Sequence, residues 1–375
     1  MSRFPLPFIF NWLLLAWLLG SYASVRAEAV SNLYEAEVAV SGQGGEARSQ
    51  GIRKAFASVL VKVSGDSSLL DNPEVGPLLS RGSRLVQQYR YKSLPTNASE
   101  GGTEGLPDRL LWARFDARAV NRLLRESGVP VWGETRPSML LWLGQEEGAR
   151  RSLISPDRVP DLQQQLSQTA DTRGLPLIWP LMDIEDQNAI QISDLWGGFE
   201  QNIRRASERY QPDVILVGRL SYRGRSSWRG EWMLYLPDKI NRWQSYAETK
   251  TAAANEGMEQ AVDALALRFA PQQVSQGISS LRLRVHGLNQ LTDYALVQDY
   301  LQSLAMIDHV DLLSADQEMV SFLLRVHGSR DALVRGIQLG AVLEPMVMQV
   351  SPDPDQPEFS EQTAVDGEGL DYRLR

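Results

Sequence analysis

The chain has 375 residues, 43% of them hydrophobic and 22% charged, which is the composition of a globular protein long enough for two or three domains. It contains no cysteine, which excludes disulfides, thiolate metal ligands, thiol nucleophiles and lipid attachment to a cysteine. The formal net charge of −8 disfavours nucleic-acid binding, because that binding depends largely on neutralising phosphates.

Residues 1–27 have the pattern of a cleavable export signal. A basic residue precedes the apolar run Phe8–Leu19, and small residues follow near the expected cleavage site between Ala27 and Glu28. The run is too short for a bilayer-spanning helix, which needs about 20 apolar residues. No later segment is apolar enough to span a membrane. The sequence therefore predicts a periplasmic protein that has no membrane span once the signal is removed.

Residues 28–135 are expected to form a first domain of the ferredoxin-like type. Alternating polar and apolar residues in Leu33–Val40 predict a half-buried strand, and apolar residues spaced by three and four from Ile52 to Val63 predict a helix. The pattern then continues as strand, strand, helix and strand over Arg84–Lys92, Leu110–Asp116, Ala117–Glu126 and Val129–Trp132. This order is that of a split βαβ domain.

Residues 136–271 are expected to form a mixed-sheet α/β domain. Continuous apolar runs separated by helical stretches indicate a buried, largely parallel sheet. These runs are Ser138–Leu143, Leu175–Met182 and Asp213–Leu220. An antiparallel pair and a closing helix are predicted over Glu231–Leu236, Asn241–Ala247 and Glu256–Phe269.

Residues 279–346 are expected to form a second ferredoxin-like βαββα domain. The fold class predicted for the whole chain is thus α/β and α+β, with two ferredoxin-like domains flanking the mixed-sheet domain. The pentapeptide Leu-Arg-Val-His-Gly occurs at 283–287 and again at 324–328. With the first and third strands taken as parallel neighbours, His286 and His327 are expected at the same end of the sheet. Residues 351–375 are proline-rich and acidic, which predicts a disordered tail.

Two groups of residues are candidates for ligand binding. His286 and His327 could bind a metal or relay a proton, but two imidazoles fall short of the three or four ligands of a zinc site. Asp183, Glu185 and Asp186 follow an apolar strand, where they could hold a divalent cation or act as a hydrolytic carboxylate pair. Both groups are also consistent with purely structural roles.

No catalytic, cofactor-binding or metal-binding residue is assigned from the sequence, and no cofactor is predicted. The chain contains no Walker loop, dinucleotide fingerprint, HExxH or GxSxG motif. Most of its tryptophans lie in apolar runs, which predicts core positions, whereas Trp196 and Trp228 lie in polar surroundings and are expected to be exposed.

Three stretches resemble an uncharacterised family of exported proteins from Gram-negative bacteria, catalogued as domain of unknown function 2066. They are LYEAEVAVSGQGGEARSQGIRKAFASVLVKVSGD at 33–66, FDARAVNRLLRESGVPVWGETRP at 115–137 and LRLRVHGLNQLTDYALVQDYLQSL at 281–304. The resemblance extends over nearly the whole chain after residue 27. It implies export, and it brings no assigned catalytic residue.

These observations favour a non-catalytic binding or assembly protein of the bacterial cell envelope, with another envelope protein as its partner. Two alternatives stay open. One is an envelope hydrolase or metal-dependent enzyme that uses the acidic or histidine residues, and the other is a protein that binds glycans or peptides through exposed tryptophans. The sequence predicts no oligomeric state.

Overall fold

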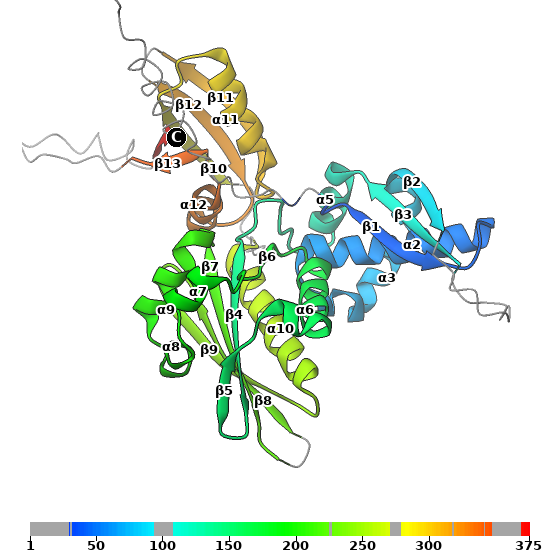
Figure 1. Ribbon diagram of the computed structural model, residues 1–375. Coiled ribbons are helices and arrows are strands. Elements are labelled where there is room, and N and C mark those ends of the chain that lie inside the picture. Colours follow the sequence, from blue (N-terminus) through cyan, green and yellow to red (C-terminus); the bar gives the residue numbers. More distant parts are fainter. Residues whose placement is uncertain are drawn as a thin grey trace, which may run out of the picture.

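The computed structural model describes residues 30, 32–93, 108–224, 227–270, 279–316, 319–340, 342–346 and 369–375. The strands of this part form three sheets, and helices pack on each of them (Figure 1). The mixed α/β class is therefore confirmed. The predicted signal, with Ala27 and Glu28, lies outside the described residues. Among the helices that are described, none combines the length and apolar character needed to cross a membrane.

The first sheet has the order β1-β3-β2, with all neighbours antiparallel. Its strands are β1 (Glu35–Val40), β2 (Val86–Ser93) and β3 (Arg109–Phe115). Helix α2 (Gly45–Ser64) packs on one face through its buried apolar residues, and α5 (Ala117–Glu126) follows β3. The connection from α2 to β2 contains the short helices η1 (Ser67–Asp71), η2 (Pro73–Val75), α3 (Gly76–Leu79) and α4 (Gly82–Leu85).

The strand predicted at Val129–Trp132 is not formed. The backbone N–H of Trp132 donates to the carbonyl of Val63, at the end of α2, over 2.7 Å. This segment therefore bonds to a helix end instead of a strand. Val129 and Val131 complete the first core, whereas the Trp132 ring enters the core of the middle unit.

The middle sheet has the order β5-β4-β7-β8-β9, with β6 beside β4. Its strands are β4 (Met139–Glu147), β5 (Arg150–Leu153), β6 (Leu177–Ile178), β7 (Val214–Tyr222), β8 (Trp228–Tyr235) and β9 (Ile240–Ala247). Strands β4, β6 and β7 are parallel, as the apolar runs predict. The run 175–182 contributes only the two residues of β6 because Pro176 and Pro180 flank them and cannot donate to a ladder.

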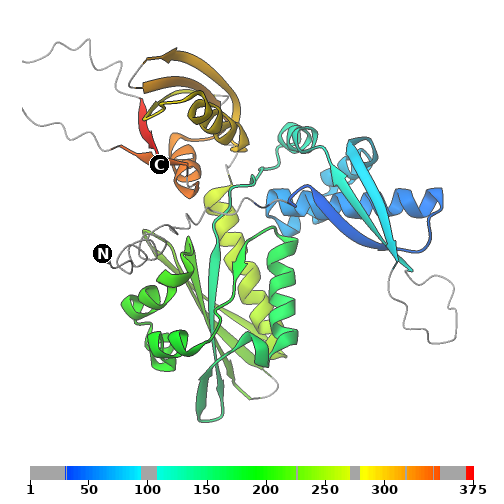
Figure 2. The same cartoon turned by 45° about the horizontal axis from the view of Figure 1, so that its top comes forward.

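Helices cover both faces of the middle sheet, because alternate residues of β4 and β7 face two different cores. One layer consists of α6 (Pro160–Thr172) and α10 (Lys250–Phe269). The other consists of α7 (Ile184–Ala189), α8 (Ile192–Gly197) and α9 (Glu200–Ser207). Figure 2 shows the two layers on either side of the strands. This arrangement explains the continuous apolar runs, since strands buried on both faces have no solvent side.

The third sheet has the order β11-β12-β10-β14-β13. Its strands are β10 (Ser279–His286), β11 (Ile307–Ala315), β12 (Met319–Val326), β13 (Leu343–Pro345) and β14 (Leu370–Leu374), and its helices are α11 (Leu291–Ser303) and α12 (Arg330–Leu339). The prediction that the first and third strands are parallel is wrong, because β10 and β12 are antiparallel. The reason is the hairpin between β11 and β12, which reverses the chain direction after the helical crossover.

The prediction of a disordered tail is wrong at the carboxyl end of the chain. Residues 370–374 form β14, an inner strand of the third sheet, parallel to β10 and antiparallel to β13. Leu370 and Tyr372 are buried in the third core. Residues 351–368 lie outside the described part of the chain. The first and third sheets share the strand order first, third, second, but neither is a standard ferredoxin-like sheet: the described first sheet has three strands, and the third contains β14.

Candidate functional site

The predicted acidic ligands of the middle unit gather around an arginine at the start of α7. Arg209 Nη1 lies 2.8 Å from Asp183 Oδ1 and 3.0 Å from Asp186 Oδ1, and Arg209 Nη2 lies 3.5 Å from Glu185 Oε2. Asp186 is fully buried and also accepts a hydrogen bond from the Tyr210 hydroxyl. A guanidinium thus occupies the position between carboxylates that a metal ion would take. Nowhere in the described residues do three or more His, Asp or Glu side chains form a group able to hold a metal.

The ion pair with Arg209 changes the pKa of Asp183, and this change can be tested. The hydrogen bond from Arg209 lowers the pKa of Asp183 to about 2. Because the pKa is lower in the folded state, Asp183 stabilises the fold above the unfolded pKa of about 3.9, and this contribution is lost as the pH falls through about 2. Carboxyl NMR of the R209Q variant should show the pKa of Asp183 returned towards its ordinary value. An unchanged titration would mean that the pair does not form in solution.

The two predicted histidine ligands lie at opposite ends of the third sheet. In the antiparallel register His286 faces Met319, whereas His327 follows the other end of β12. His286 Nε2 lies 3.7 Å from Asp371 Oδ1, and His327 Nε2 lies 3.7 Å from Asp308 Oδ1. Each histidine therefore has a carboxylate neighbour of its own, and the two do not form a common site.

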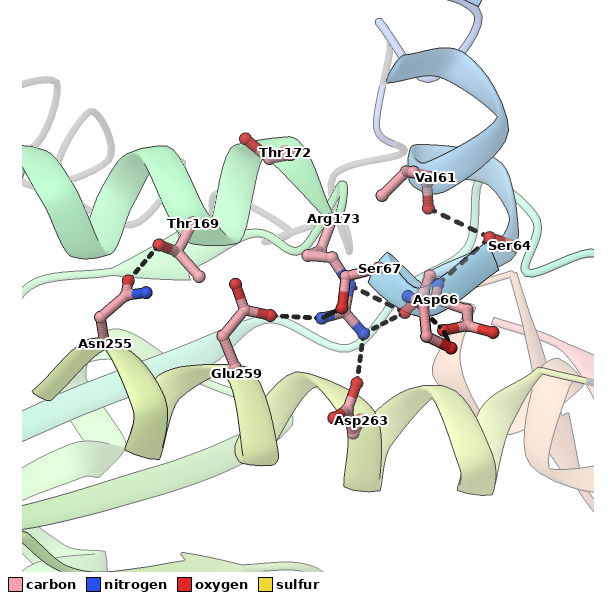
Figure 3. Close-up of polar contacts among 12 residues, drawn as sticks. Val61, Ser64, Asp66, Ser67, Thr169, Thr172, Arg173, Asn255, Glu259 and Asp263 are labelled. Atoms are coloured by element: carbon pink, nitrogen blue, oxygen red, sulfur yellow. Dashed lines mark hydrogen bonds and ion pairs between the residues drawn. The ribbon is translucent and has the colours of Figure 1, made fainter. Parts of the chain in front are cut away.

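Two buried arginines, which the sequence analysis did not single out, join the first unit to the middle one. Arg173 follows α6 and is 1% exposed. Its Nε donates to the carbonyl of Gly65, the residue that ends α2, over 2.9 Å, and its Nη1 contacts Ser67 Oγ over 3.3 Å. Its guanidinium also pairs with Glu259 and Asp263 on α10 (Figure 3). Arg173 thus connects two helices of the middle unit to the end of a helix in the first.

Arg136 completes this junction through bonds to backbone carbonyls, and no carboxylate of the described residues pairs with it. Its guanidinium is fully buried, stacks on the Trp132 ring at 4.3 Å and donates to six backbone carbonyls. These belong to Lys62, Val63, Trp132, Gly133, Arg173 and Gly174. Four of them lie at the carboxyl ends of α2 and α6, where helix dipoles favour a cation. Burial lowers the pKa of Arg136 to about 9, so the group stays charged at neutral pH.

The face of the first sheet that points away from α2 carries an aromatic and charged surface, here called the Trp112 face. Inward-facing residues of β1 and β3 pack in the first core, whereas the outward-facing ones are exposed or half-buried. Trp112 lies at its centre, on the middle strand. The charged residues of the face are Glu35, Glu37, Arg90, Lys92 and Arg114.

Side chains on all three strands hold the Trp112 ring in place. The Arg90 guanidinium lies over the ring at 4.4 Å from its centroid, and that of Arg114 at 5.5 Å. The indole N–H donates to Glu35 Oε2 over 3.1 Å, and Arg114 Nε donates to Glu35 Oε1 over 2.7 Å. The ring is thereby fixed on a half-exposed surface before any partner binds.

The sequence analysis placed Trp112 in the core because it lies in an apolar run. The alternation in RLLWARF carries the missed signal, since Leu111, Ala113 and Phe115 are buried and the residues between them face outwards. The prediction that Trp196 and Trp228 are exposed is not met. Both are half-buried, with Arg151 over the first ring at 5.1 Å and Lys250 over the second at 5.6 Å.

Comparison with known proteins places a family match on this same unit. Residues 27–133 match the family described as "Domain of unknown function (DUF8605)". The resemblance to a family of unknown function is thus confirmed at that level. A search of curated proteins finds no match.

Two solved structures show a distant similarity to parts of this chain. The Protein Y N-terminal domain of Thermus thermophilus is 11% identical, with a TM-score of 0.17, and covers 34% of this chain and 93% of its own. The LpoB C-terminal domain of Salmonella enterica is 10% identical, with a TM-score of 0.22, and covers 34% and 91%. These scores are too low to support a conclusion about fold or function.

Proposed function

We propose that this chain is a non-catalytic binding or assembly protein of the bacterial cell envelope that meets a protein partner through the Trp112 face. The observation that carries the proposal is a tryptophan held on an open sheet face by Arg90 and Glu35. Tryptophan and arginine are the residue types that most often dominate the binding energy of protein interfaces. A ring that is fixed in advance loses little conformational entropy on binding.

The charge of the face also suits a protein surface. Three basic and two acidic side chains surround Trp112, and Lys92 pairs with Glu37 over 2.7 Å. Such a mixture provides directional contacts around an aromatic centre, and this is the usual arrangement of a polar rim around an interface core. The Arg90 guanidinium lies over the ring, in the position that a sugar stacked on that ring face would take. A protein partner therefore fits this face better than a glycan.

The proposed location outside the cytoplasm rests on the signal pattern of residues 1–27. The family match begins at residue 27, next to the expected cleavage between Ala27 and Glu28. We extend the proposal to the Gram-negative periplasm and to the family of domain of unknown function 2066 on the resemblance of residues 33–66, 115–137 and 281–304. The shared strand order of the first and third sheets supports the proposal that both units are variants of the ferredoxin-like type.

The W112A variant is expected to lose its partner without unfolding. Removal of a central interface tryptophan typically weakens binding by at least about 2 kcal/mol, or about 30-fold. The matched control is Y246A, because Tyr246 is an aromatic residue on a strand of the middle unit whose side chain is exposed. Cross-linking in intact cells followed by quantitative mass spectrometry should recover the same protein with wild type and Y246A, and little of it with W112A or R90A.

Equal recovery of that protein with W112A and wild type would rule out the Trp112 face as the contact. Melting curves of the variants provide the folding control. The location is tested separately, by the mass of the chain purified from the periplasmic fraction. That mass should correspond to a chain that begins at Glu28, whereas a cytosolic chain that retains Met1 would contradict export.

A further inference from the structure

The middle sheet ends in a strand whose outer edge is open. β9 is the last strand of this sheet, and it pairs with β8 in an unbroken antiparallel register over all eight of its residues. It contains no proline and no bulge. An edge of this kind presents a row of unpaired N–H and C=O groups that can pair with a further strand.

The other edge strands of the described sheets carry features that hinder such pairing. β5 and β6, on the opposite side of the middle sheet, have four and two residues. β13 has three residues, with Pro345 among them, and the registers of β2 and β11 are interrupted. On β1, the Lys62 ammonium donates to the carbonyl of Glu35 over 3.0 Å. These features limit association between sheet edges, whereas β9 is long, regular and free of proline.

The backbone groups of Arg242 and Gln244 point outwards from the β9 edge. At the turn between β8 and β9, the N–H of Leu236 donates to the carbonyl of Lys239 over 2.9 Å. Because antiparallel pairs alternate in their bonding, the odd-numbered residues of β9 bond to β8 and the even-numbered ones point away. In agreement, the N–H of Tyr246 donates to a carboxylate of α10 over 3.2 Å. No described residue pairs with the outward N–H and C=O groups of Arg242 and Gln244.

We propose that β9 pairs antiparallel with β9 of a second copy of this chain, about a two-fold axis at Trp243. In this register Arg242 of each copy lies opposite Gln244 of the other, and the two residues exchange backbone hydrogen bonds. Every outward N–H and C=O of these two residues is then paired, and the bond from the Tyr246 N–H to α10 stays in place. Two-fold dimers are the commonest assemblies of identical chains, since the same surface serves both partners.

The charges of β9 suit pairing with a copy of itself. Arg242 is the only charged residue of the strand, and in the proposed register it faces an uncharged glutamine. Like charges directly opposite each other destabilise a strand pair, and this register avoids them. The net charge of −8 on the whole chain therefore has no counterpart within the strand.

Trp243 provides an aromatic centre for the pairing. Its half-buried ring is stacked on Trp232, with 6.5 Å between the ring centroids, and its indole N–H donates to the carbonyl of Gly257 on α10 over 3.3 Å. On the two-fold axis the two Trp243 residues lie directly opposite, where cross-strand aromatic pairs stabilise a sheet. A tryptophan that is held in place beforehand, at the centre of the contact, is typical of residues that dominate the binding energy of an interface.

Sedimentation velocity of the full chain, at concentrations up to millimolar, tests this pairing. We expect wild type to form a concentration-dependent dimer. Gln244→Lys places a lysine opposite Arg242 twice in each dimer and should raise the dissociation constant at least about tenfold. Gln244→Glu places a carboxylate there and should lower the constant about threefold. The double variant Arg242→Glu, Gln244→Lys again sets opposite charges against each other and should dimerise like wild type.

Gln164→Lys and Gln164→Glu are the matched controls. Gln164 is an exposed glutamine of the same unit, on α6, so these variants change the net charge equally and should leave the dissociation constant unchanged. Melting curves show whether each variant is folded. The proposal is overturned if wild type stays monomeric, even where β9 cross-links to another protein in cells, because the occupant would then be a foreign strand.

The direction of the charge effects tests the register. If Gln244→Lys and Gln244→Glu shift the dissociation constant in the same direction, or if the double variant fails to restore the dimer, the two residues do not lie opposite each other and the proposal is wrong. It is also wrong if the Gln164 variants weaken the dimer as much as Gln244→Lys does, since the effect would then come from net charge alone.

Discussion

The R136M variant is expected to lose about 3–5 kcal/mol of unfolding free energy, as much as is lost when one partner of a buried charged network is removed. Methionine fills a similar volume but donates no hydrogen bond. Six backbone carbonyls each lose one hydrogen bond at once, and backbone acceptors cannot be replaced by apolar groups. Because these carbonyls belong to both the first and the middle unit, loss of the hydrogen bonds to them should also allow the two units to unfold separately.

Urea unfolding followed by tryptophan fluorescence measures this effect. We expect one transition for wild type, and two transitions or a single much earlier one for R136M. R136K should fall between them, since lysine keeps the charge but has three donors in place of five. R150M is the matched control, because Arg150 is exposed on β5 and should change stability by no more than about 0.5 kcal/mol. An R136M chain as stable as R150M would show that the junction does not hold the units together.

Local patterns predicted the secondary structure well where one face of an element is buried. The alternation in Leu33–Val40 corresponds to β1, and the three-and-four spacing from Ile52 to Val63 lies within α2. The continuous apolar runs of the middle unit correspond to β4 and β7, which are covered on both faces. In these cases the burial of each residue follows from the period of its own element.

Strand direction and pairing could not be obtained in the same way. The repeated Leu-Arg-Val-His-Gly pentapeptide suggested equivalent positions for His286 and His327, but β10 and β12 run in opposite directions. Direction depends on whether a hairpin or a crossover joins the strands, and that is a property of the connection rather than of the pentapeptide. The assumption of parallel neighbours therefore placed two distant histidines together.

The side-chain partners at the candidate sites could not be predicted from local patterns either. Asp183 and Asp186 do meet, but the cation between them is Arg209, which is distant in sequence and belongs to another segment. The buried arginines were missed because charged residues are seldom fully buried. At Arg136 the acceptors are backbone carbonyls at helix ends. Such acceptors cannot be identified from residue types in a sequence.

β14 was missed because composition outweighed a short local pattern. Leu370 and Tyr372 alternate with polar residues, as in a half-buried strand, but they follow an acidic, proline-rich stretch. Their place is also fixed by a long-range partner, since β14 lies between β10 and β13 and pairs with both. The carboxyl terminus of the chain is therefore part of a folded sheet.

Deleting residues 369–375 is accordingly expected to destabilise the third unit by several kcal/mol. The burial of Leu370 and Tyr372 contributes about 3–6 kcal/mol, at about 1.5–3 kcal/mol for each side chain. The deletion also removes Asp371, which holds Arg284 through two hydrogen bonds of 2.7 and 2.6 Å. Both β10 and β13 then lose the strand between them, which exposes unpaired backbone groups on each.

A matched pair of point variants separates loss of the core from loss of chain length. Y372A should lower stability by about 3 kcal/mol, because it leaves a cavity in the third core. R373A alters the next residue, whose side chain is exposed, and should stay within about 0.5 kcal/mol of wild type. Hydrogen exchange of the amides in β10 provides the local measurement. Their protection should fall in the truncated chain and in Y372A, but not in R373A. Protection of β10 that survives the truncation would mean that β14 is not an integral strand of the sheet.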